Sequence, residues 1–85
     1  MNQGGTTRLT VLYFASLRDA AGRGDESVET DAADLRGLYA TLRERHGFAL
    51  PAERLRVAVD GAFAHWDDAP RAGSEVAFIP PVSGG

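Results

Sequence analysis

Residues 34–47 read DLRGLYATLRERHG and predict the main helix of the chain. Apolar side chains recur in it at the i, i+3, i+4 and i+7 spacing that lines one face of an α-helix. These residues are Leu35, Leu38, Tyr39 and Leu42. Asp34 is a suitable N-cap, and Gly47 is a suitable stop after a basic last turn that complements the helix dipole. The helix therefore has one apolar face, which needs a second layer to cover it.

A strand predicted at residues 8–14 supplies part of that layer, because it is rich in β-branched and aromatic residues. One of its faces carries Leu9, Val11 and Tyr13, whereas Leu12 and Phe14 add apolar character to the other. A strand that is apolar on both faces is either covered twice or presents one face to a partner.

The remaining strands follow from alternation and from turn residues. Residues 25–30 are polar enough to predict an edge strand. Residues 55–59 alternate and end at the turn signal Asp60-Gly61, after which residues 62–66 resume as a short strand. Residues 75–79 predict the last strand, which ends before two prolines because proline cannot donate to a ladder.

A second, shorter helix is predicted at residues 16–21. Ser16 and Asp19 have the spacing of a capping box, in which each side chain bonds to the backbone of the other residue. Gly22 is a suitable residue to end this helix, since glycine readily adopts the left-handed conformation found there.

The order of elements predicts an α+β domain, with the main helix packed across one face of a mixed sheet. The first and last strands are expected side by side and parallel in the sheet centre. This arrangement is the β-grasp, or ubiquitin-like, fold. The expected boundaries are a disordered lead-in at residues 1–7, the β-grasp domain at 8–79, and an extended tail at 80–85.

The tail reads PPVSGG. Pro80 and Pro81 each fix φ near −65° and favour an extended, stiff segment. Flexibility returns at the final glycines, which have no Cβ and leave the terminal carboxylate unhindered. Such an arm can reach into the active site of another protein, where ATP could activate the carboxylate, while the domain docks outside.

Composition argues against several classes of partner and location. The net charge is −3 and there is no basic cluster, which argues against nucleic acid. No apolar run is long enough to span a membrane, and the polar N-terminal residues do not resemble a secretory signal. The expected location is the cytoplasm.

The sequence also contains no complete catalytic site. Without cysteine there is no disulfide, thiolate metal site or internal thiol nucleophile. His46 and His65 lack a motif and are interpreted as a helix-end residue and a surface or strand residue. We expect no metal and no bound cofactor. All nine basic residues are arginine, so no internal lysine can accept an isopeptide bond.

Two segments resemble the small subunit of molybdopterin synthase, the MoaD-like sulfur carriers. They are residues 11–15, with Leu17 and Arg18 after them, and residues 75–85. The resemblance covers essentially everything after residue 7, and the ending PPVSGG is its most specific part. A diglycine end alone also fits ubiquitin, thiazole-synthesis carriers and tRNA-thiolation carriers.

The resemblance implies that Gly85, preceded by Gly84, is adenylated with ATP by an E1-like enzyme and converted to a thiocarboxylate by a sulfur donor. The tail would then enter the large subunit of a heterotetramer with two large and two small subunits. There it would donate sulfur to cyclic pyranopterin monophosphate and build the dithiolene of molybdopterin. The catalytic groups of that step would belong to the large subunit, and this chain would be a co-substrate.

The resemblance also implies a docking face for the large subunit. Its residues are Phe14, Phe63, Ile79, Pro80, Pro81, Val82 and Ser83. Ile79 is out of phase with Val76 and Phe78, so it is expected to point away from the helix-covered core. A core position for Phe14 and Phe63 stays open, because apolar strand residues are usually buried.

Three alternatives to this function remain at the level of sequence. The chain could carry sulfur for another pathway, such as tRNA thiolation or thiazole synthesis. It could be a ubiquitin-like modifier that is joined to lysines of other proteins. It could also be a plain interaction module, for which the terminal carboxylate would be irrelevant.

Overall fold

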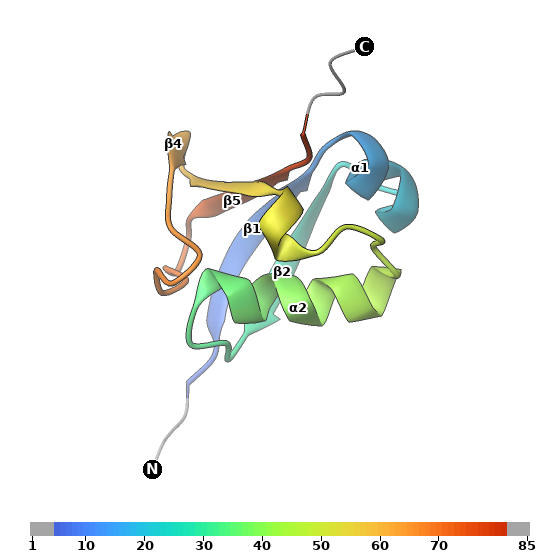
Figure 1. The fold of residues 1–85 in the computed structure, drawn as a ribbon. Coiled ribbons are helices and arrows are strands. Elements are labelled where there is room, and N and C mark those ends of the chain that lie inside the picture. The colour runs from blue at the N-terminus through green and yellow to red at the C-terminus, as the bar shows by residue number, and fades with distance from the viewer. Residues whose placement is uncertain (1–4, 82–85) are drawn as a thin grey trace.

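The computed structural model describes residues 5–81, which form a mixed five-stranded sheet with a long helix across one face (Figure 1). The strands are β1 (Thr7–Tyr13), β2 (Asp25–Thr30), β3 (Arg56–Val59), β4 (Ala62–Phe63) and β5 (Glu75–Ile79). The helices are α1 (Ala15–Ala21), α2 (Leu35–His46) and the short 3-10 turn η1 (Ala52–Arg54). β1 begins one residue before the expected position, and the prediction of a β-grasp fold is confirmed.

The strand order is β2-β1-β5-β3-β4, so the first and last strands lie in the centre. β1 and β5 are parallel, with register from Thr10↔Glu75 to Tyr13↔Phe78, and the other neighbouring strands are antiparallel. β2 occupies an edge, as its polar sequence predicted. Asp60 and Gly61 have φ values of 51° and 86°, and such a left-handed pair is typical of a tight hairpin turn.

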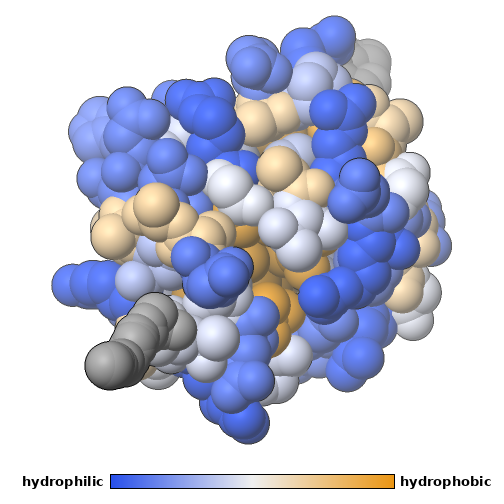
Figure 2. All heavy atoms as spheres, turned by 90° about the horizontal axis from the view of Figure 1, so that it is seen from below, coloured by the Kyte–Doolittle hydropathy of each residue, from blue (hydrophilic) through white to orange (hydrophobic). Residues whose placement is uncertain are grey.

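The core lies between α2 and one face of the sheet. Alternate residues of β1 and β5 face it, and the four apolar side chains predicted from the helical spacing are all buried. The largest fully buried side chains include Tyr13, Tyr39 and Phe78. Trp66 is partly buried and stacks on Phe78 with ring centroids 5.8 Å apart. Figure 2 views the molecule from the end opposite to the one at which β5 ends. This surface is mostly hydrophilic, with a small apolar area at its centre.

The ends of α2 agree with the sequence. The side chain of Asp34 accepts a hydrogen bond from the backbone N–H of Gly37 at 2.8 Å. At the other end Gly47 has φ 73°, a conformation that glycine adopts at low cost, and its N–H donates to the carbonyl of Arg43.

The start of α1 differs from the prediction. The helix begins at Ala15, and Phe14 is its N-cap without any side-chain hydrogen bond, so the expected Ser16–Asp19 capping box is wrong. The carbonyl of Phe14 accepts from the N–H groups of Leu17 and Arg18, which places Ser16 inside the first turn rather than before it. Gly22 ends the helix in the left-handed conformation, as expected.

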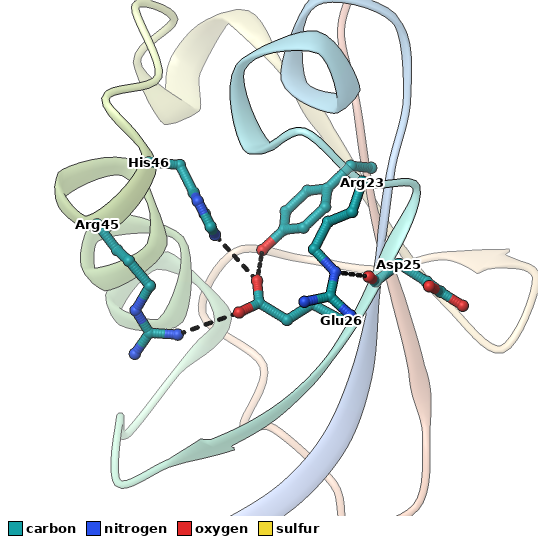
Figure 3. Close-up of polar contacts among 6 residues, drawn as sticks. Arg23, Asp25, Glu26, Arg45 and His46 are labelled. Carbon is teal, nitrogen blue, oxygen red and sulfur yellow. Dashed lines mark hydrogen bonds and ion pairs between the residues drawn. The ribbon is translucent and has the colours of Figure 1, made fainter.

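A polar cluster around Glu26 fastens the end of α2 to β2 (Figure 3). The Glu26 side chain is 15% exposed, and its Oε1 lies 2.9 Å from Nε2 of His46. Its carboxylate also accepts a hydrogen bond of 2.7 Å from the hydroxyl of Tyr13, and Arg45 lies 3.5 Å away. His46 therefore pairs with a carboxylate on another element, which its sequence position did not reveal.

The cluster changes the pKa of two of its members. Burial acts to raise the pKa of Glu26, but the hydrogen bonds from Tyr13 and His46 and the nearby positive charges outweigh burial, so the pKa lies below its ordinary value. Burial, together with the hydrogen bond to Glu26, raises the pKa of Tyr13. Both shifts keep Glu26 charged and Tyr13 protonated near neutral pH.

We expect Glu26→Gln to lower the free energy of unfolding at pH 7 by about 1–3 kcal/mol, because it weakens hydrogen bonds to a mostly buried charge. Folding lowers the pKa of Glu26. The contribution of its charge to the free energy of unfolding is therefore complete above the ordinary pKa of 4.5, and it is lost as the pH falls through the pKa of the folded state. Urea unfolding of both proteins across this range measures the difference, which should shrink in acid.

The matched control is Glu29→Gln on the same strand, where the carboxylate is exposed and pairs with Arg8 on the surface. That variant should change stability by less than about 1 kcal/mol. An equal loss in the two variants, or a Glu26→Gln loss that does not depend on pH, would contradict the role assigned to the cluster.

Candidate functional site

The sheet face that α2 leaves uncovered carries an apolar row across four strands. The register places Leu12 beside Ala77, Ala77 beside Ala58, and Ala58 beside Phe63. The two central positions are alanines, so larger side chains flank a flat middle. Phe63, at the end of the row, is 68% exposed. An exposed aromatic beside small residues is a surface that a partner can cover.

A second row on the same face contains Phe14 and Ile79. Ile79 is the second residue after Ala77 on β5, so this row lies nearer to the C-terminal end of that strand. Phe14 and Ile79 each directly follow the paired residues Tyr13 and Phe78, and Ile79 pairs with Arg56 of β3. Phe14 is 45% exposed and Ile79 is half-buried, whereas the residues that precede them in sequence, Tyr13 and Phe78, are buried. The prediction that Ile79 points away from the core is confirmed, and the core alternative for the two phenylalanines is wrong.

The two rows meet the base of the tail at a hollow of about 590 Å³. Phe63, Ile79, Pro80 and Pro81 line it, and the hollow therefore brings together four of the predicted docking residues. Phe14 is not among them. It lines a separate hollow of about 430 Å³ with Leu12 and Arg18, among others.

Arg56 is a residue of this site that the sequence interpretation missed. It lines the hollow at the tail base, and its Cζ lies 4.7 Å from the centroid of the Phe63 ring. Arg54 lines the same hollow. The period of two in residues 55–59 already placed Arg56 on the face opposite Val57, but outside the tail the prediction considered only apolar side chains as docking residues.

The other predicted site residues are Val82, Ser83, Gly84 and Gly85, which lie outside the described residues. Among residues 5–81, no three His, Cys, Asp or Glu side chains gather in a way that could hold a metal ion. In that same part of the chain, no helix has the length and apolar character needed to cross a membrane. What the site provides is apolar contact area, the guanidinium groups of Arg54 and Arg56, the carboxylate of Glu53 and the start of a proline-stiffened segment.

The matches to known proteins cover nearly the whole chain. The family model described as the ThiS family matches residues 11–85. The molybdopterin synthase sulfur carrier subunit of Escherichia coli (strain K12) is 34% identical over 80 residues, which is 91% of this chain and 99% of that protein.

Solved structures give the same fold. SAMP1 from Haloferax volcanii, a small archaeal modifier protein, matches with a TM-score of 0.75 and 28% identity, over 92% of this chain and 99% of that one. A chain of the complex of subunits 1 and 2 of the molybdopterin-converting factor from Helicobacter pylori 26695 matches with a TM-score of 0.64 and 21% identity. That match covers 93% of this chain and 100% of the other, and it is a likeness of fold.

Proposed function

The chain belongs to the ThiS family, and we propose that it is the sulfur carrier subunit of a molybdopterin synthase. The observation that carries the proposal is the 34% identity to a curated sulfur carrier subunit over 99% of that protein's length. The ending PPVSGG and the exposed apolar face at the base of the tail support it, because a carrier needs both a reactive tip and a docking surface.

The reactive group in this proposal is the carboxylate of Gly85. A carboxylate is a poor electrophile, so an E1-like enzyme first joins it to AMP from ATP, and pyrophosphate leaves. A sulfur donor then displaces AMP, and the product is a C-terminal thiocarboxylate. This is covalent catalysis divided between two proteins, in which one activates the tip and another uses it. The chain acts as a co-substrate and binds no cofactor of its own.

The acceptor in this proposal is the large synthase subunit. The open face of the sheet docks on it, with Phe14, Phe63 and Ile79 in contact, while residues 80–85 enter its active site and deliver sulfur to cyclic pyranopterin monophosphate. The two-subunit complex of the Helicobacter pylori factor supports a partner of this kind. We expect the working assembly to contain two large and two small subunits and to lie in the cytoplasm.

The test is to incubate the purified chain with ATP, the activating enzyme and a sulfur donor, alkylate the product and measure its intact mass. Because the chain has no cysteine, an alkylated product reports a C-terminal thiocarboxylate. Addition of the large subunit and cyclic pyranopterin monophosphate should then yield molybdopterin. No alkylation, by an activating enzyme that is competent on a known carrier, would contradict the proposal, and a thiolated tRNA or thiazole product instead would assign another pathway.

A second candidate function is protein modification, which the likeness to SAMP1 favours. The activated Gly85 would then be joined to lysines of other proteins. Since this chain has no lysine, it cannot build chains on itself through internal isopeptide bonds. Adducts of higher mass that resist reduction in cell extract would identify this function, and their absence would exclude it under the conditions that give the thiocarboxylate.

A further inference from the structure

Arg56 places a positive charge among the apolar residues of the docking face. Its position on β3 pairs with Ile79, and its guanidinium lies over the ring of Phe63 at 4.7 Å from Cζ to centroid. Within residues 5–81, Arg54 and Arg56 form no ion pair, whereas five other arginine–carboxylate pairs occur elsewhere. The hollow at the tail base is lined by these two arginines and by one carboxylate, that of Glu53, in a chain whose net charge is −3.

The position of the guanidinium over the ring leaves it ready to bind a carboxylate. A cation over an aromatic face is attracted by the ring, and the contact restricts the arginine side chain. The N–H groups at the edge of the guanidinium remain available, and their planar fork matches a carboxylate in a bidentate arrangement. Arginine and large aromatic residues are also the types enriched where interfaces gain most of their binding energy.

Burial of Phe63 by a partner would remove water from Arg56 as well, because the two side chains are in contact. The removal of water from a guanidinium that gains no partner group costs free energy, because the charge is left unpaired. Glu53 also lines the hollow, but it lies 4.0 Å from Arg36, and among residues 5–81 no carboxylate forms an ion pair with Arg56. A carboxylate of the partner can therefore fill this place.

We propose that Arg56, assisted by Arg54, recognises an Asp or Glu side chain of the protein that covers Phe63. The inference rests on the proposed function, since the partner concerned is the large synthase subunit. That subunit should present a carboxylate at the rim of the apolar pocket that receives Phe63. The charge pair selects partners and fixes the orientation in which the tail enters, while the apolar rows supply contact area.

The test is the Kd of the full chain for the large subunit, measured by calorimetry for wild type, Arg56→Gln, Arg56→Glu and Arg56→Lys at about 50 mM and about 500 mM salt. At low salt Arg56→Gln should weaken binding about tenfold or more, Arg56→Glu should weaken it further, and Arg56→Lys should restore part of the loss. At high salt the differences should shrink. Because Arg56 is exposed, all three variants should stay folded, which circular dichroism checks.

Arg8→Glu is the matched control. Arg8 lies on the same open face but about 20 Å along β1 from Phe14, and it pairs with Glu29. It should change the Kd less than about twofold. Equal effects of Arg8→Glu and Arg56→Glu, or a loss independent of salt, would overturn the inference while wild-type binding still supports the proposed function. Absence of wild-type binding would overturn both.

Discussion

Deletion of Gly85 should abolish thiocarboxylate formation and sulfur transfer while the domain stays folded. One residue of extended chain spans at most about 3.6 Å, so the deletion withdraws the carboxylate by that distance from the site that activates it. A displacement of about 1 Å can cost about 100-fold in rate, and a displacement this large should leave no measurable product. The buried hydrophobic residues run from Leu9 to Phe78, which is why stability should not change.

Intact mass after alkylation measures the first step, and the yield of molybdopterin with the large subunit measures the second. The matched control adds one alanine after Gly85, which keeps the diglycine but displaces the carboxylate in the other direction. This variant should also be inactive and fully folded by thermal unfolding. Sulfur transfer that survives in either variant would mean that the terminal carboxylate is not the carrier group.

Phe63→Asp should weaken binding to the large subunit by about 100-fold or more and leave the isolated domain folded. Loss of an exposed aromatic anchor commonly costs an interface about 2–4 kcal/mol, which corresponds to a loss of this size. The new carboxylate would also lie beside Arg56 and neutralise it within the chain. Calorimetric titration measures the Kd, and circular dichroism checks the fold.

Ala62→Asp is the control, because it puts the same charge at the neighbouring exposed position of β4, which pairs with Val59 rather than Ala58. It should change the Kd by less than about threefold, since surface substitutions outside an interface have small effects. If Phe63→Asp unfolds the free chain, or binds as tightly as Ala62→Asp, Phe63 is not a docking residue.

The predictions that succeeded depend on local pattern. The spacing of Leu35, Leu38, Tyr39 and Leu42 identified α2 and its buried face, because a helix repeats every 3.6 residues whatever it packs against. Alternation placed Ile79 on the open face, because successive side chains of a strand point to opposite faces of the sheet. The start of α1 failed because the carbonyl of Phe14 begins the helix without a capping side chain, and the sequence offered Ser16 as a better cap.

The amino-acid sequence by itself determined the apolar face of α2 through its helical spacing, and the stiffness at Pro80 and Pro81 through rings that restrict φ. Only the tertiary structure decided that Phe63, Ile79 and Pro80 share one hollow with Arg56, and that Glu26 meets His46. Periodicity shows which residues share a face within one element. It does not show which strands become neighbours or which sheet face a helix covers, because pairing between distant segments settles both.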